Sequence, residues 1–238
     1  MRALCRASTP WGRRNQKGVD GRDKPGLTDN GAFMSLQNRV SPFGELFADP
    51  SRGSLFGNRG GKFHREDRTL GKRRHASRQW ICCVLSFKGR SRDVWGRYYT
   101  ELFFLDEPTA LAAGHRPCFE CRRAEAIAFA SKFPGGNGRA QAGEMDRVLH
   151  AERLEADGRS KRLHPVALDG LPDGVFVTRD GNESFAVKGK RLLRWSPGGY
   201  AGAIERPSGR AMMLTPPAIR EVLARGYAPH WHESIASL

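Results

Sequence analysis

Two cysteines, Cys118 and Cys121, carry the clearest chemistry in this sequence. In a C-x-x-C segment both thiolates can turn toward one point and hold a metal ion. Arg116 and Arg122 flank the pair, and cationic neighbours favour the thiolate form that zinc requires. We therefore predict a zinc site here. A redox-active pair and two inert buried thiols are the alternatives.

Further sulfur ligands lie upstream, in the adjacent Cys82 and Cys83. The run from 80 to 88 alternates as a strand does, so the two side chains should point to opposite faces. Cys83 shares its face with the apolar side chains of that run, and we expect it to be the third ligand. A structural zinc site has four protein ligands. The fourth would be Cys82, if the strand breaks there, or a histidine.

Among the histidines, His64 is the favoured fourth ligand. The glycines just before it would let the backbone approach the metal closely, because glycine tolerates conformations that other residues avoid. His75 and His115 are the next candidates.

Short elements should position these ligands. The run from 80 to 88 predicts a strand, and the run from 98 to 104 predicts the strand that returns beside it. Asp106 can cap a short helix that ends at Gly114. A further helix should follow the C-x-x-C segment and stop at Pro134.

The last third of the chain has its own pattern of elements. A helix is expected within 142–158, and a hairpin plus a third strand within 173–196, with Asp180-Gly181 as the hairpin turn. The run 211–214 suggests one more strand. Thr215 should cap a final helix that has a proline in its first turn.

These elements predict an α+β fold: a small zinc-stapled core of β-hairpin and helix at 34–135, and a small α+β unit at 136–238. Residues 1–33 show no apolar period and are rich in Arg, Gly, Asp and Pro. Such a composition cannot bury enough surface to offset the entropy of ordering. We interpret 1–33 as a disordered arm, or as a mis-called start ahead of Met34, with no structural role for Cys5.

The charge balance points to an anionic partner. The chain has 238 residues and a net charge of +15, with hydrophobic residues at 39%. Arginine, which matches phosphate geometry, suggests nucleic acid, and in particular the DNA backbone. The expected phosphate contacts are Arg73, Arg74, Arg78, Arg90, Arg92, Arg116, Arg122 and Arg123. No apolar run approaches the roughly 20 residues of a membrane span, and no apolar signal core is present. We therefore expect a cytoplasmic protein without a membrane partner.

The segment 98–123 has an aromatic pair, a short alanine-rich helix and a G-x-R-P-C-x-x-C-R ending. It resembles the second half of the amino-terminal metal-binding domain of the Ada DNA-repair family. The matching positions are Phe103, Phe104, Gly114, Arg116, Pro117, Cys118, Cys121 and Arg122. The resemblance implies that Cys118 and Cys121 are two of four zinc ligands and that arginines touch a DNA backbone.

The chain also departs from that family. The family's first two ligands form a C-x-x-x-C segment, and one of them accepts a methyl group from DNA methylphosphotriesters. Here Cys82 and Cys83 are adjacent. No Pro-Cys-His-Arg segment is present either.

Three functions follow from these patterns. The first is a nucleic-acid-binding protein in which zinc is structural. The second is a DNA-repair methyl acceptor, with Cys83 as the zinc-bound thiolate that takes the methyl group. The third is a metal-dependent hydrolase with an open water position and His64 or Glu66 as the base.

Overall fold

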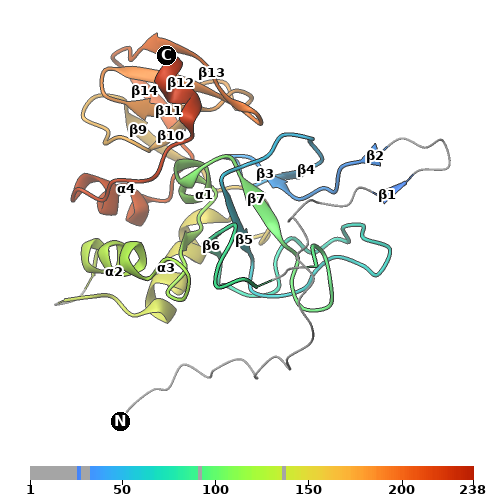
Figure 1. The fold of residues 1–238 in the computed structure, drawn as a ribbon. Helices are drawn as coiled ribbons and strands as arrows, with labels where there is room; N and C mark the ends of the chain where they lie inside the picture. Colours follow the sequence, from blue (N-terminus) through green and yellow to red (C-terminus); the bar gives the residue numbers. More distant parts are fainter. Residues whose placement is uncertain (1–25, 28–32, 91–92, 136–137) are drawn as a thin grey trace.

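The structure is a computed structural model that describes residues 26–27, 33–90, 93–135 and 138–238. Within them the fold is mixed α+β, with two six-stranded sheets and four α-helices (Figure 1). A two-residue pairing of β1 (Gly26–Leu27) with β2 (Phe33–Met34) precedes them. Most of the predicted arm, including Cys5, lies outside the described residues, as does Arg92.

The first sheet has the strand order β4-β3-β7-β5-β6-β8. Its strands are β3 (Arg39–Val40), β4 (Leu46–Phe47), β5 (Leu55–Asn58), β6 (Ile81–Val84), β7 (Leu102–Phe104) and β8 (Arg116–Pro117). β5 pairs antiparallel with both β6 and β7, whereas β6 pairs parallel with the short β8. The returning strand is therefore shorter than predicted, and β5 separates it from β6.

The second sheet is antiparallel throughout, in the order β13-β12-β11-β10-β14-β9. Its strands are β9 (His164–Ala167), β10 (Phe176–Thr178), β11 (Phe185–Lys188), β12 (Arg191–Ser196), β13 (Gly199–Glu205) and β14 (Arg210–Met213). The predicted hairpin and third strand correspond to β10, β11 and β12. The edge strands β9 and β13 were not predicted.

The helices are α1 (Glu107–Ala112), α2 (Arg123–Lys132), α3 (Ala142–Arg153) and α4 (Pro217–Ala224), with a closing 3-10 helix at Glu233–Ser237. Figure 1 shows α2, α3 and α4 grouped on one side of the molecule. α1 begins as predicted, because the Asp106 carboxylate accepts a hydrogen bond from the Thr109 amide at 3.0 Å. Gly114 follows it with φ +86°, as a left-handed helix end requires.

The last helix begins differently from the prediction. Its N-cap is Pro216, and no side chain caps it. The Thr215 hydroxyl instead accepts a hydrogen bond from the Phe176 amide at 2.9 Å. The Thr215 hydroxyl therefore binds the backbone of β10 and does not cap the helix.

The main apolar core crosses the predicted boundary at 135/136. Leu111 of α1 and Phe129 of α2 lie in one buried cluster with Leu149, Val175 and Ile219. A second cluster fills the first sheet, and a third joins α1 to the second sheet. The two predicted units therefore share their interior.

Gly57 lets β5 and β6 approach closely at the position where Gly57 pairs with Cys82. A Cβ atom there would lie 2.2 Å from the Ile81 carbonyl oxygen and 2.8 Å from Phe104. Because overpacking a core of this kind costs about 1–3 kcal/mol, Gly57→Ala should lower the free energy of unfolding by that amount in urea denaturation.

The matched control is Gly143→Ala in α3, where nothing lies within 4 Å of the added carbon. It should stabilise the protein by about 0.4–1 kcal/mol, because alanine restricts the unfolded chain. Equal effects of the two variants would contradict the close approach at Gly57.

Candidate metal centre

Three cysteines from separate parts of the sequence meet in the first sheet. The sulfur atoms of Cys83, Cys118 and Cys121 all lie within 4.8 Å of one another. Cys83 belongs to β6, whereas the other two lie between β8 and α2. Phe56 packs in the same buried cluster and shields the group. The geometry brings together three of the five predicted metal ligands.

Strand pairing explains how the chain brings these sulfurs together. β8 lies beside β6 with Pro117 opposite Cys82, and the Cys118 amide donates to the Cys82 carbonyl oxygen at 3.0 Å. The C-x-x-C segment therefore starts at the edge of β6. We call residues 118–121 the knuckle. Because side chains alternate along a strand, Cys83 faces the same side of β6 as the two knuckle cysteines.

Local hydrogen bonds also favour negative charge on the knuckle. The Glu120 amide donates to the Cys118 sulfur at 3.4 Å. Hydrogen bonds from the Cys121 and Cys83 thiols hold the pKa of Cys118 far below its usual value. Hydrogen bonds from the Cys83 thiol to Cys118 and to Cys121, together with burial, raise the pKa of Cys83. Such an arrangement carries a thiolate readily, which a metal site needs.

Cys82 faces the opposite side of β6 and is absent from the three-sulfur group. It packs in the core of the first sheet with Leu102 and Phe104. Its sulfur accepts a hydrogen bond from Arg122 Nη1 at 3.2 Å, and burial raises the pKa of its thiol to about 12. Because the strand stays regular, Cys82 does not turn toward the knuckle.

His64 also lies outside the three-sulfur group. Its Nδ1 atom lies 2.8 Å from the Thr100 hydroxyl, and its ring stacks on Trp95 at a centroid distance of 5.1 Å. The other candidates, His75 and His115, pack against Trp80. Each histidine is thus committed to an aromatic contact, and the prediction of His64 as a ligand finds no support in the geometry.

Two predicted phosphate contacts are buried instead. Arg116 is 2% exposed and forms two hydrogen bonds of 2.8 Å with the Asp146 carboxylate. Arg122 is also 2% exposed and donates to Glu107 at 2.8 Å. Both arginines therefore bind interior carboxylates, and the geometry gives no support to their prediction as phosphate contacts. Arg73, Arg74, Arg78, Arg90 and Arg123 are exposed.

The buried pair of Arg122 and Glu107 lies next to the centre and was not predicted. Glu107 also accepts hydrogen bonds from the Tyr227 hydroxyl at 2.6 Å and from the His230 amide at 3.0 Å. Burial lowers the pKa of Arg122, but Cys82 and Glu107 outweigh this and raise it above its usual value. The only sign of this pair in the sequence is the adjacent acids Asp106 and Glu107, which lie at the start of the predicted short helix.

The connection between β6 and β7 presents exposed aromatic and basic side chains. Its exposed apolar side chains are Leu85 at 48%, Tyr98 at 52% and Tyr99 at 44%. Arg97 lies over the Tyr98 ring at 5.7 Å. Arg90 pairs with Glu120 of the knuckle at 2.7 Å. The connection is thereby tied to the knuckle itself.

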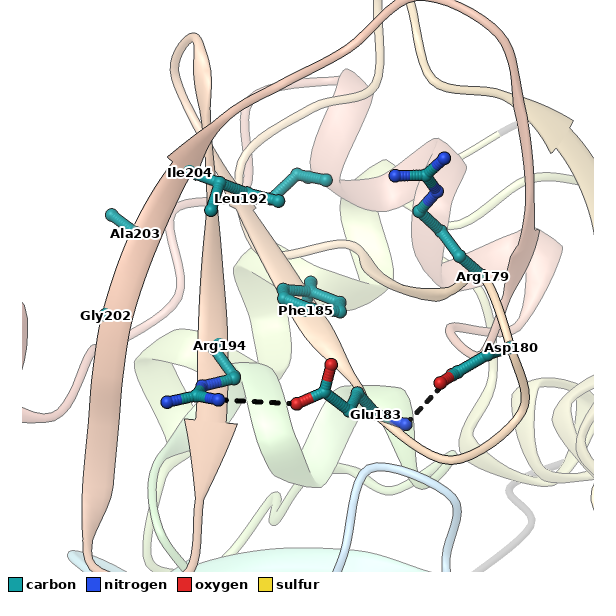
Figure 2. A pocket seen from close by; sticks show the side chains of 9 residues that line it. All are labelled: Arg179, Asp180, Glu183, Phe185, Leu192, Arg194, Gly202, Ala203 and Ile204. Carbon is teal, nitrogen blue, oxygen red and sulfur yellow. Dashed lines mark hydrogen bonds and ion pairs between the residues drawn. The ribbon is translucent and has the colours of Figure 1, made fainter.

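A separate open pocket of about 600 Å³ lies on the second sheet (Figure 2). Arg179, Asp180, Glu183, Phe185, Leu192, Arg194, Gly202, Ala203 and Ile204 line it. Glu183 and Arg194 pair with each other at 3.5 Å, and Asp180 accepts from the Glu183 amide at 3.1 Å. Because these carboxylates already have partners within the pocket, it offers no second metal site.

Within the described ranges, no helix is both long enough and apolar enough to cross a membrane. Comparison with protein-family models, with curated proteins and with solved structures finds no match to this chain.

Proposed function

We propose that this protein binds zinc through Cys83, Cys118 and Cys121, that the zinc is structural, and that the protein binds nucleic acid. The observation that carries the metal part is the meeting of three sulfur atoms within 4.8 Å. Clustered thiolates favour zinc over the harder divalent cations. A reducing compartment such as the cytoplasm, where thiols persist, suits such a centre.

A structural role follows from the elements that the metal would join. Zinc bound by these cysteines would link β6 to the turn that starts α2. Without it, β6 and β8 meet only over two residue pairs. Metal binding free energy can add directly to folding free energy, so the ion would staple strand and helix into one core. The fourth ligand of such a structural site would be a protein donor outside the three-sulfur group.

Charge and surface chemistry support the nucleic-acid part. The chain carries a net charge of +15. Exposed Arg90, Arg97 and Tyr98 lie in the β6–β7 connection, and Arg90 pairs with Glu120 of the C-x-x-C segment. Interleaved aromatic and basic side chains suit single strands, because bases stack on the rings while cations contact the phosphates. The resemblance of 98–123 to the Ada amino-terminal domain implies a contact to the DNA backbone, but its matching arginines, Arg116 and Arg122, are buried here, so the exposed arginines would have to make that contact.

The two alternatives have weaker support. A hydrolase would need a base at the metal, yet His64 lies outside the sulfur group and Glu66 is paired with Lys62 at the surface. A methyl acceptor would need an accessible sulfur, and Cys83, the predicted acceptor, is only 5% exposed.

Oligonucleotide binding should depend steeply on salt. With about six phosphates of a single strand contacted, affinity should fall roughly 300-fold between 50 and 200 mM salt, because the counterions bound to the strand are released. Fluorescence anisotropy with a labelled single strand measures this. Tyr98→Ala should weaken binding by about 1–3 kcal/mol through lost stacking.

The matched control is Arg191→Ala, an exposed change on the second sheet. It should remove at most one phosphate contact and leave the Tyr98 effect intact. Affinity that stays flat across this salt range would rule out the nucleic-acid part of the proposal and leave the metal part standing.

A further inference from the structure

A group of cationic and imidazole side chains surrounds Trp80, away from the metal centre. The guanidinium carbons of Arg59 and Arg153 each lie 3.9 Å from the Trp80 ring centroid. His115 packs on the same ring at 5.0 Å. Arg59, Arg153 and His115 are each at most 1% exposed. We call this group, with Lys161, His75 and His150, the Trp80 cation cluster.

The three cations of this cluster, the buried Arg59 and Arg153 and the half-buried Lys161, bind only neutral groups. Arg59 donates to the carbonyl oxygens of Gly44 at 2.8 Å and Arg74 at 3.2 Å. Arg153 donates to those of Gly114 at 2.9 Å and Arg78 at 2.7 Å. Lys161 donates to the Ala112 carbonyl oxygen at 2.5 Å. Among the described residues, none of the three cations has a carboxylate within ion-pair distance.

Few compensating charges surround the cluster. The Asp146 carboxylate acts to raise the pKa of Arg153, but both oxygens of Asp146 are bound by Arg116. The other charged neighbours are basic. Arg74 lowers the pKa of Arg59, and Arg73 lowers the pKa of His75. Buried charge is costly unless it is paired. Accordingly, burial lowers the pKa of Arg59 to about 9 and lowers those of Arg153 and Lys161.

Two buried nitrogen atoms in the cluster have no hydrogen-bond partner, Nε of Arg153 and Nδ1 of His115. A buried polar group without a partner costs about 1–3 kcal/mol. The cations without a carboxylate partner and the two nitrogen atoms without a hydrogen-bond partner therefore belong to the same cluster.

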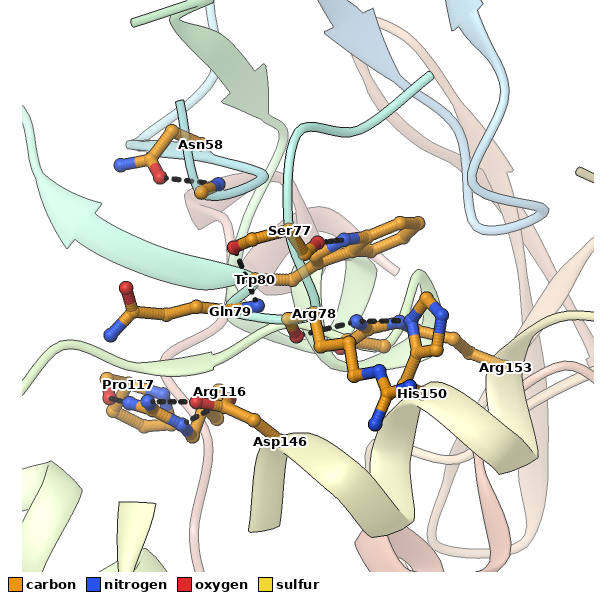
Figure 3. A network of polar contacts seen from close by, with 12 residues as sticks. Asn58, Ser77, Arg78, Gln79, Trp80, Arg116, Pro117, Asp146, His150 and Arg153 are labelled. Carbon is orange, nitrogen blue, oxygen red and sulfur yellow. Dashed lines mark hydrogen bonds and ion pairs between the residues drawn. The ribbon is translucent and has the colours of Figure 1, made fainter. Parts of the chain in front are cut away.

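The cluster reaches the surface through His75, His150 and Arg78. The rings of His75 and His150 lie 5.3 Å apart, and both residues are partly exposed. Nδ1 of His150 lies 3.0 Å from Arg153 Nη2. Figure 3 shows Arg78, His150 and Arg153 close together on the α3 side of Trp80. Arg78 itself is exposed.

We propose that His75, His150 and Arg78 form the mouth of a phosphate-binding site whose positive field is supplied by the Trp80 cation cluster. A phosphate group carries the negative charge that the cluster lacks, and its oxygens accept hydrogen bonds from guanidinium and imidazole donors alike. The positive field disfavours a metal cation at the same imidazoles. This site goes beyond the proposed function, because it requires neither zinc nor the β6–β7 connection.

Proton uptake should accompany binding. Burial, Arg153, His75 and Arg78 together lower the pKa of His150 to about 4, so the free imidazole is neutral near pH 6. Burial lowers the pKa of His75 as well, with Arg153, Arg59 and Arg73 acting in the same direction. A bound anion favours the charged imidazole and raises both values. Binding should therefore strengthen as pH falls.

The test is calorimetric titration of the full chain with inorganic phosphate and with a short oligonucleotide. Proton uptake by the protein is measured with sulfate in place of phosphate, because sulfate is a tetrahedral anion that does not titrate near pH 6. The sulfate titration is repeated in two buffers of different ionisation enthalpy, and the difference in binding enthalpy gives the number of protons taken up. Loss of one charge-assisted hydrogen bond in His150→Ala or Arg78→Ala should weaken binding about tenfold. Arg191→Ala is the control, and thermal unfolding checks that each variant is folded.

Binding of inorganic phosphate that weakens in both mouth variants would support a site for free phosphate or small phosphorylated molecules. If only the oligonucleotide binds, and the same variants weaken it, the site recognises backbone phosphates. The proposal is overturned if neither binds, if the mouth variants bind as the parent does, or if sulfate binds without proton uptake. A protein that loses zinc but keeps phosphate binding would separate this site from the metal centre.

Discussion

Replacing Cys118 with serine is expected to abolish stoichiometric zinc binding and to destabilise the fold. Cys118 lies within 4.8 Å of both other sulfurs and accepts the Glu120 amide hydrogen bond, so its loss leaves only two thiolates. If the parent is held at a free zinc concentration about 1,000 times its Kd, bound metal contributes about 4 kcal/mol of stability. Elemental analysis and urea unfolding should show both losses together.

Cys82→Ala is the matched control, because Cys82 is a neighbouring buried cysteine on the opposite face of β6. It should keep one equivalent of zinc while losing some packing and the contact with Arg122. Adding a chelator to the parent should reproduce the stability of Cys118→Ser but should not alter Cys118→Ser itself. A folded parent that contains no zinc under metal-replete conditions would contradict the metal centre.

Glu107→Ala should strongly destabilise the fold, although Glu107 lies outside the metal centre. Glu107 is fully buried and accepts hydrogen bonds from Arg122, from the Tyr227 hydroxyl and from the His230 amide. Its removal would leave the buried Arg122 guanidinium with only the longer contact to the half-buried Glu125 carboxylate at 3.6 Å, and breaking a buried ion pair in this way costs about 3–5 kcal/mol. Urea unfolding gives the difference directly.

Glu155→Ala is the control for this prediction. Glu155 also pairs with an arginine, Arg162 at 3.2 Å, but both side chains are exposed. Pairs of this kind contribute about 0–1 kcal/mol because water and salt screen them. Equal losses in the two variants would mean that the Glu107 pair is not held in the interior.

The same contacts bear on the two-unit organisation predicted at 34–135 and 136–238. Asp106 accepts from the Tyr200 hydroxyl at 2.8 Å, and Glu107 accepts from Tyr227. These hydrogen bonds and the shared apolar core join the two halves. Coincident transitions monitored by different probes are therefore expected in both Glu107→Ala and the parent.

The sequence predicted best those features that depend on the backbone preferences of a few neighbouring residues. The Asp106 cap and the Gly114 end of α1 depend on single-residue backbone preferences, and the structure has both. The hairpin turn at Asp180-Gly181 and the helix after the knuckle likewise depend on local chemistry. Strand alternation, together with the apolar face that Cys83 shares, predicted Cys83 as the third ligand, and Cys83 lies in the same cluster as Cys118 and Cys121.

Partners across long sequence distances could not be read in the same way. An arginine beside a C-x-x-C segment looks the same in sequence whether it meets phosphate or a buried acid. Arg116 meets Asp146, which lies in α3, and Arg122 meets Glu107 in α1. His64 looked suited to the metal, yet the turn after β5 carries it to Thr100 and Trp95.

The sequence by itself determined the C-x-x-C knuckle, the mixed α+β character and most of the element types, because these depend on spacing and on backbone preference. Only the tertiary structure decided that β8 brings the C-x-x-C segment beside β6, which arginines are buried and which cations gather around Trp80. Those outcomes depend on strand order and on burial, which bring together residues far apart in the chain and give the same side chain opposite roles in water and in the core.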